Sequence, residues 1–235
     1  GGIDARNYVL NGSAFGSAAA VTAGANPDGT AATNVAAIAA APLGVALDAV
    51  YNGTTRFTST GGATNAAAGT VSTGGSLQVA GLMGSERLTE VTVSDANADV
   101  VTAGKSVTAA AGSNGFVASN YALHVGANPS VADGAITSAN NSVAITPAPL
   151  GVAAAPTYNG STDFTATAGV AHGTTGSLTT GGSVSVAGLV NGQTLGGFSL
   201  DSANVVGASK VTGVSLTGGI DARNYVLNGS AFGSA

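Results

Sequence analysis

Few side chains in this sequence belong to types that carry out chemistry. It has six Lys and Arg, eleven Asp and Glu, two His and no Cys among 235 residues. His124 and His172 have no partners at the fixed spacing that a metal site requires. No strand–turn–helix context supports a serine nucleophile with a His and an Asp. We therefore expect no catalytic activity, no cofactor and no metal ion.

The aspartates offer one alternative to this expectation. Asp95 and Asp99 enclose a single Asn, and Asp28 and Asp133 lie in glycine turns. Calcium takes six to eight oxygen ligands, usually with several carboxylates. Asp99 aligns with Asn204 in the repeat described below, so its charge is not repeated. Turn formation by these side chains is the preferred interpretation.

Lys105 and Lys210 are the two lysines of the chain, and they align with each other. A Lys–Asn isopeptide bond is one possibility, with Asn52 and Asn159 as aligned candidates. Such a bond needs an adjacent acid, and no aligned acid is present. The alternative is an exposed lysine that protects a strand from edge pairing.

Composition excludes several classes of protein. The net charge is −5, and six basic residues cannot neutralise a nucleic-acid backbone. The lack of cysteine excludes a disulfide scaffold, and no apolar run is long enough for a membrane span. With 7% charged residues, neighbouring chains repel each other little. These features favour a packed fibre or a crowded surface over a freely soluble enzyme.

The sequence repeats itself at two periods. Residues 218–235 are identical to residues 1–18, at an offset of 217. Residues 149–164 resemble residues 42–57 at an offset of 107, and GGSVSVAGL at 181–189 follows GGSLQVAGL at 74–82. We predict three segments: residues 1–37 close a preceding module, 38–144 form module 1, and 145–235 form module 2, which is incomplete.

The modules are predicted to consist of strands. Residues 76–81, 91–96, 106–111, 121–126 and 142–147 alternate or carry β-branched runs, and six Asn-Gly pairs between apolar segments indicate hairpins. No segment has convincing helical periodicity. We expect an all-β fold of tandem antiparallel β-sandwich modules, Ig-like or β-grasp-like, strung end to end.

Aromatic residues recur at fixed places in the repeat. They are Tyr51, Tyr158, Phe57 and Phe164 in and after a Tyr-Asn-Gly turn, and Tyr8, Tyr121 and Tyr225 in Asn-Tyr-x-Leu. A row of aromatics can stack on sugars, but one ring at each module position is more typical of a core anchor. We predict structural anchors.

Two segments carry a family resemblance. VAITPAPLGVAAAPTYNGST (143–162) resembles the opening of the YDG/MBG-type repeats of large secreted bacterial adhesins, and NVVGASKVTGVSLTGGIDARNYVL (204–227) is similar to their ending. The family's turn Asp is Asn at Asn52 and Asn159, and the first joint reads Ile38-Ala-Ala-Ala-Pro42. The resemblance covers nearly the whole chain and implies filamentous-haemagglutinin-like exoproteins, in which such repeats form a stalk.

The expected function is a non-enzymatic structural repeat in the stalk or filament of a bacterial surface adhesin or biofilm matrix fibre. A glycan- or receptor-binding adhesin module is the alternative. The expected location is the bacterial cell surface or the extracellular matrix, after secretion. The expected partner is the protein itself, head-to-tail or laterally, with host or bacterial glycans bound by parts outside this chain. No nucleic acid or membrane span is expected.

The two ends of the chain are expected to be complementary. The copy at 218–235 begins the closing part of a module, and its continuation corresponds to residues 19–37, with candidate strands around Val21 and Val35. A module without its last strands has unpaired backbone groups. We expect them to be supplied in one of two ways: the chain continues past Ala235 with the same sequence, or residues 1–37 of a neighbouring copy fill the place by strand addition.

Overall fold

The computed structural model describes residues 9–10, 13–14, 24–25, 31–32, 38–94, 99–100, 104–123, 140–227 and 230–231. The chain divides into two units, residues 1–39 and 40–235. The described strands of the first unit form two antiparallel pairs: β1 (Val9–Leu10) with β2 (Ser13–Ala14), and β3 (Gly24–Ala25) with β4 (Ala31–Ala32).

Strands dominate the described part of the chain, which contains no α-helix. The helical turns there are short 3-10 segments: η2 (Ala118–Asn120), η3 (Thr217–Gly219) and η4 (Ala222–Asn224). The prediction of an all-β fold is therefore confirmed.

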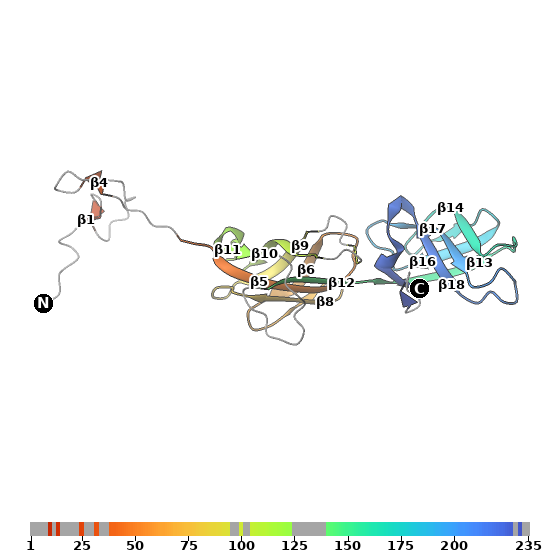
Figure 1. Cartoon of the computed structure of the whole chain (residues 1–235), viewed down its shortest axis with the longest axis horizontal. Helices are drawn as coiled ribbons and strands as arrows, with labels where there is room; N and C mark the ends of the chain where they lie inside the picture. The colour runs from red at the N-terminus through yellow and green to blue at the C-terminus, as the bar shows by residue number, and fades with distance from the viewer. Residues whose placement is uncertain are drawn as a thin grey trace. The chain divides into compact units, whose positions relative to one another are not determined.

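An eight-stranded sheet is built from residues 41–146, which we call the first half (Figure 1). Its order is β10-β9-β6-β7-β8-β5-β11, and β12 also pairs with β5. The strands are β5 (Ala41–Val50), β6 (Arg56–Ala63), β7 (Gly69–Val71), β8 (Gly75–Ala80), β9 (Arg87–Val93), β10 (Val107–Ser113), β11 (Tyr121–Leu123) and β12 (Asn141–Thr146). Both β11 and β12 run parallel to β5, and the other pairs are antiparallel.

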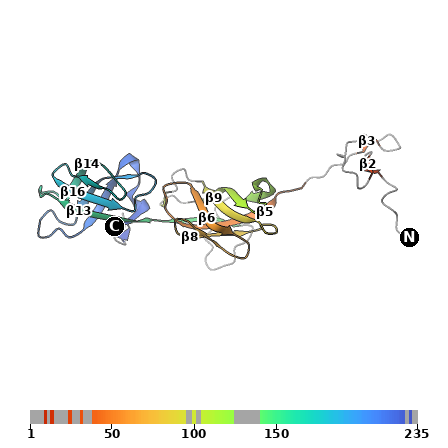
Figure 2. The ribbon, with the colours of Figure 1, turned by 180° about the vertical axis from the view of Figure 1, so that it is seen from behind.

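Two further sheets are built from residues 148–231, the second half. One has the order β15-β16-β13-β19-β20 and the other β14-β17-β18. Their strands are β13 (Ala148–Pro156), β14 (Asp163–Ala171), β15 (Thr175–Ser177), β16 (Gly182–Ala187), β17 (Thr194–Leu200), β18 (Val211–Leu216), β19 (Tyr225–Leu227) and β20 (Ser230–Ala231). Figure 2 shows β13 beside β16, its antiparallel neighbour.

The two halves share one pattern of strand pairing. β13 pairs with β16 and β19 as β5 pairs with β8 and β11. β17 pairs with β14 and β18 as β9 pairs with β6 and β10. The pairs Leu200–Val211 and Val93–Val107 occupy the same place in the two patterns. The sequence repeat of 107 residues is therefore a structural repeat.

The apolar core consists mainly of valine and leucine with a few rings. Alternate residues of the strands point into it, as in β8, where Leu77 and Val79 are buried between half-buried neighbours. Phe164 and Phe198 stack with their ring centroids 5.4 Å apart. In this aromatic-poor chain each ring supplies a large share of the buried apolar area.

Period-two alternation located the strands correctly. Each of the five segments predicted from it overlaps a strand, namely β8, β9, β10, β11 and β12, although residues 91–96 share only the last three residues of β9. Apolar side chains at alternate positions bury one face of a strand whatever its partner is. The alternation therefore indicates a strand without indicating its neighbours.

The hairpin prediction is wrong for four of the six Asn-Gly pairs. The pairs at 11–12 and 228–229 join strands that pair with each other, β1 with β2 and β19 with β20. Those at 52–53, 114–115, 159–160 and 191–192 connect strands that do not pair with each other. Asn114 and Asn191 have positive φ angles of 57° and 52°, so the dipeptide turns the chain. Packing of the sheets then decides which strands meet.

The first half ends two residues after the predicted module boundary, which lies between residues 144 and 145. Ile145 and Thr146 pair with Ala49 and Val50 of β5, and Pro147 then separates β12 from β13. Residues predicted to open module 2 therefore complete the sheet of the first half.

Candidate self-association site

Backbone hydrogen bonds tie β12 to β5 at both ends of the strand. The Asn141 side chain, at the start of β12, adds a contact with β10. The Val45 N–H donates to the Asn140 carbonyl and the Tyr51 N–H to the Thr146 carbonyl, each at 2.9 Å. Asn141 Oδ1 accepts from the Val107 N–H at 2.7 Å, and its Nδ2 donates to the Val107 carbonyl at 3.0 Å. Asn141 is 2% exposed, so it satisfies two backbone groups of β10 away from water.

Two tyrosines and one glutamine join the first half to the second. Gln193 Nε2 donates to the Tyr51 hydroxyl at 2.9 Å, and the Tyr225 hydroxyl donates to Gln193 Oε1. The Tyr51 and Tyr225 rings meet edge to face, with centroids 5.5 Å apart and an interplanar angle of 80°. Burial raises the pKa of Tyr51, and it raises the pKa of Tyr225 to about 12. Both phenols therefore stay neutral at physiological pH.

Two asparagines add contacts between the halves. The buried Asn224 accepts from the Val100 N–H at 2.7 Å and donates to the Asp99 carboxylate. Asn191 Nδ2 donates to the Gly53 carbonyl at 2.8 Å. Together with Gln193 these groups make a joint of hydrogen bonds around buried rings, and the Asp99 carboxylate is the charged group among the atoms just named. A joint of this kind, without ion pairs, resists changes in salt better than surface ion pairs do.

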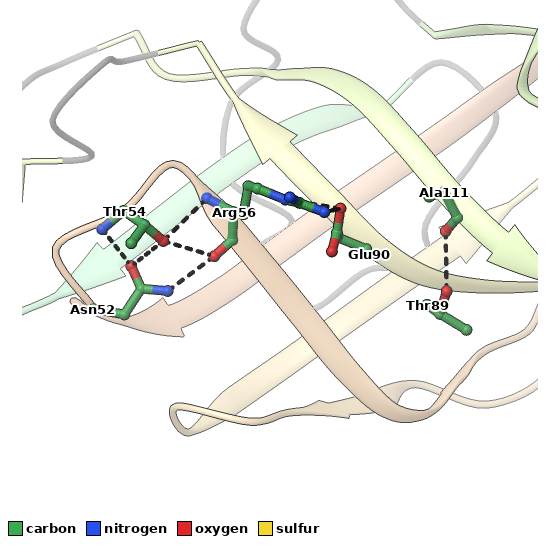
Figure 3. Close-up of polar contacts among 6 residues, drawn as sticks. All are labelled: Asn52, Thr54, Arg56, Thr89, Glu90 and Ala111. Carbon is green, nitrogen blue, oxygen red and sulfur yellow. Dashed lines mark hydrogen bonds and ion pairs between the residues drawn. The ribbon is translucent and has the colours of Figure 1, made fainter. Parts of the chain in front are cut away.

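The Tyr-Asn-Gly turn is built by its own side chains (Figure 3). Asn52 Oδ1 accepts from the Thr54 N–H at 2.8 Å, and its Nδ2 donates to the Arg56 carbonyl at 2.9 Å. Arg56 Nε in turn donates to Glu90 at 3.0 Å. In the second half, Asn159 Oδ1 accepts from the Ser161 N–H at 2.9 Å. Both asparagines therefore act as Asx-turn residues.

A groove with a volume of about 480 Å³ lies in the second half, beside β13. Its lining includes residues of β13, β14 and β18 and part of the loop 201–210. Asp201 organises this loop by accepting from the Ser209 hydroxyl at 2.6 Å and from the N–H groups of Ser209 and Lys210 at 2.9 and 3.2 Å. These bonds, the Ser209 hydroxyl first, lower the pKa of Asp201 to about 2.

The predicted aromatic anchors differ in burial. Tyr51, Phe57, Phe164 and Tyr225 are buried. Tyr121 is half-buried and stacks on Phe116, with centroids 5.2 Å apart. Tyr8 lies outside the residues whose side chains are described.

The prediction of a core anchor is wrong for Tyr158. Its side chain is 64% exposed and lines the groove, whereas the aligned Tyr51 is 3% exposed. The groups that cover Tyr51 come from Gln193 and Tyr225. Tyr158 has no such cover among the described residues.

The two lysines also occupy different environments. Lys105 is buried, and its Nζ donates to the Asp99 carbonyl, so its predicted role as an exposed edge guard is wrong. Lys210 is exposed. The Asn52 amide, the candidate partner for an isopeptide bond, is bonded within its own turn.

The structure describes few of the remaining candidate ligands. Asp28, Asp95, Asp133 and His124 lie outside the described residues. His172 Nδ1 accepts from the Gly188 N–H at 2.8 Å. Across the described ranges, no three His, Cys, Asp or Glu side chains gather in a group that could hold a metal ion.

The residues that make the joint were mostly missed from the sequence. Gln193 and Asn141 were not predicted as site residues, because amides at turns and strand starts are common in β proteins, and Asn191 was predicted only as part of an Asn-Gly turn. Asn224 carried a usable signal, since the Asn of Asn-Tyr-x-Leu recurs at Asn7, Asn120 and Asn224. A polar residue that recurs beside a buried ring indicates a repeated hydrogen bond.

In the part of the chain that the structure describes, no helix has the length and apolarity needed to cross a bilayer. Comparison with protein-family models, with curated proteins and with solved structures finds no match to this chain. The resemblance to YDG/MBG-type repeats therefore stays a prediction from the quoted motifs.

Proposed function

We propose that this chain is a non-enzymatic structural repeat, exported to the bacterial cell surface or matrix, that forms part of the stalk or filament of a large adhesin or biofilm fibre. In this proposal each half is a sandwich module of the YDG/MBG type, and the modules are strung end to end. The protein's main partner is itself, and glycans are bound by parts outside this chain.

The observation that carries the proposal is the way in which β12 joins the two halves. This strand follows the first repeat in sequence, completes its sheet along β5, and continues after one proline into β13. Pulling the halves apart would strip a six-residue strand from β5 and expose Asn141 and Tyr51. A joint of this kind suits a protein that has to bear tension.

A glycan-binding module is the second candidate. The observation that favours it is the exposed ring of Tyr158 in the groove beside β13. Exposed aromatic rings are suited to stacking on sugars. Glycan binding that is lost in Tyr158→Ala, with the melting curve unchanged, would support this candidate over a structural role for the groove.

The length of an array tests the stalk proposal. Chains containing one, two and three copies of the 217-residue period are imaged by negative-stain electron microscopy. If modules are strung end to end with strands of five to eight residues along the axis, the particles lengthen by about 70–90 Å per period. Particles that become wider rather than longer would contradict the proposal.

A further inference from the structure

Among the described residues of the second half, no strand corresponds to β12 of the first half. In the first half, β5 pairs with β8 on one edge and with β11 and β12 on the other. In the second half, β13 pairs with β16 on one edge and with β19 on the other, but β19 reaches only Leu150. Among the described strands, none pairs with the remaining edge of β13 at residues 152–156, where β12 would lie.

The groove beside β13 lies at the place that β12 occupies beside β5 in the first half. Val152, Ala154 and Val211 line it and are half-buried. Of their counterparts in the first half, Val45 and Leu47 pair with residues of β12 and Val107 is bound by Asn141, and all three are at most 2% exposed. The groove therefore has the place of a strand-binding site, with Val152, Ala154 and Val211 as its apolar part and Ser202, Ser209 and Lys210 on its polar side.

We propose that this groove receives residues 34–39 of a second copy of the chain, as a strand parallel to β13. Residues 34–43 read NVAAIAAAPL, and residues 141–150, which contain β12, read NSVAITPAPL at the same offset of 107. Ile38 is 99% exposed, whereas Ile145, its counterpart in β12, is 8% exposed. An exposed isoleucine whose counterpart in the repeat is buried against a neighbouring strand is suited to packing in the same way on a second copy.

The register follows from the pairing of β12 with β5. Asn141 pairs with Val45 and Ile145 with Ala49. The same register places Asn34 of the second copy against Val152 and its Ile38 against Pro156. Asn34 then reaches the backbone of the Val211 position, as Asn141 clasps Val107.

Pro156 makes the edge of β13 accept fewer kinds of added strand than the edge of β5 does. Proline has no N–H, so the edge offers one donor fewer than the Ala49 position of β5 does. Proline on an edge strand discourages the addition of unrelated strands. Residues 34–39 also supply the Asn34 amide and the Ile38 side chain, so they are favoured over a strand that offers backbone hydrogen bonds alone.

The contact of Tyr51 with Gln193 and Tyr225 has counterparts that a second copy would bring together at the groove. Tyr158 takes the place of Tyr51, and Glu86 and Tyr121 take the places of Gln193 and Tyr225. Within this chain the Tyr121 hydroxyl already donates to Glu86 Oε2, as that of Tyr225 donates to Gln193. In the complex, the Glu86 carboxylate of the second copy accepts from the Tyr158 hydroxyl as well.

The contact between Val100 and Asn224 also has exposed counterparts in the repeat. Val100, whose N–H is bound by Asn224, is half-buried, while its counterpart Val205 is 75% exposed. Asn120, the counterpart of Asn224, is exposed. In the complex, Asn120 of the second copy binds the Val205 N–H.

Sedimentation of the whole chain over a range of concentrations tests this inference, which rests on the proposal that the protein works as an array. The wild-type chain is expected to form head-to-tail oligomers. Ile38→Asp is expected to weaken association at least about tenfold, because the counterpart Ile145 is 8% exposed and a carboxylate at that position would lose its contact with water. Ala37→Asp is the matched control, because the counterpart Ala144 faces solvent, and it should associate like the wild type.

Cross-linking tests the register in a chain that has no cysteine of its own. Thr146 pairs with Val50, so a chain carrying Ala39→Cys should form a disulfide dimer with a chain carrying Thr157→Cys. The same Ala39→Cys chain mixed with one carrying Ala155→Cys is out of register by two residues, beyond disulfide reach, and should dimerise far less.

Equal sedimentation of the wild type and Ile38→Asp, or equal cross-linking at 155 and 157, would overturn the inference. Association that survives Ile38→Asp but is lost on adding glycan would identify the groove as a sugar site instead. Arrays that lengthen by the expected step without register-specific cross-linking would leave the stalk proposal standing and refute this joint. In-register cross-linking with arrays that do not lengthen would support this joint and refute the stalk proposal.

Discussion

Replacing each of the aligned tyrosines Tyr51 and Tyr158 by alanine should have very different effects on stability. Tyr51 is 3% exposed, packs edge to face on Tyr225 and accepts a hydrogen bond from Gln193. Truncation of a buried large aromatic costs about 3–5 kcal/mol, so Tyr51→Ala should lower the free energy of unfolding by about that amount. Tyr158 is 64% exposed, so its removal should cost less than about 1 kcal/mol.

Urea unfolding followed by far-ultraviolet circular dichroism measures the difference. The chain has no Trp, and the substitutions remove tyrosines, so the backbone signal is the suitable probe. The measurement is made at low protein concentration, where Tyr158 is not covered by a second copy. Tyr51→Phe separates the hydrogen bond from the ring and should cost about 0.5–1.5 kcal/mol.

Equal losses of stability in Tyr51→Ala and Tyr158→Ala would refute this reasoning. They would mean that both rings are buried in the free chain, or that the joint between the halves adds nothing to the stability of the first half. A small effect of both substitutions would refute it equally, because it would remove Tyr51 from the stabilising core.

Three further results are expected. Asn141→Ala should lower the free energy of unfolding by about 2–5 kcal/mol in urea titrations, because it leaves the buried N–H and carbonyl of Val107 without partners. The raised pKa of Tyr225, about 12 against 10.0 for the free side chain, means that its contribution to stability is complete below pH 10 and is lost as the pH rises to about 12; Tyr225→Phe should flatten this alkaline decline in thermal melts. Asp201 should titrate near pH 2 by nuclear magnetic resonance, and Ser209→Ala should move its pKa towards 3.8, because the Ser209 hydroxyl is the main cause of the shift.

Local sequence was sufficient to predict the strands and the turns. The alternation at residues 76–81 and 142–147 identified β8 and β12, because burying one face of a strand requires apolar residues at every second position. Asn52 was correctly interpreted as a turn residue, because its amide bonds within five residues of itself. Such features depend on neighbours in the sequence and not on the fold.

Strand pairing could not be predicted in the same way. Asn-Gly at 52–53 turns the chain, yet β5 pairs with β8, β11 and β12 and not with β6. Pairing with β12 brings together residues almost 100 positions apart, as the contact of Thr146 with Ala49 shows. Competition among distant strands for one edge is decided by packing of the whole sheet.

The candidate site likewise has features that follow from the sequence and features that depend on the fold. The sequence alone determined that the chain is a repeat, that Tyr51 and Tyr158 are equivalent positions, and that its ends match other parts of itself. Only the tertiary structure decided that Tyr51 is covered by Gln193, 142 residues away, while Tyr158 is open. The physical reason is that burial depends on a residue's surroundings in space: Gln193 and Tyr225 cover Tyr51, and among the described residues no such pair covers Tyr158.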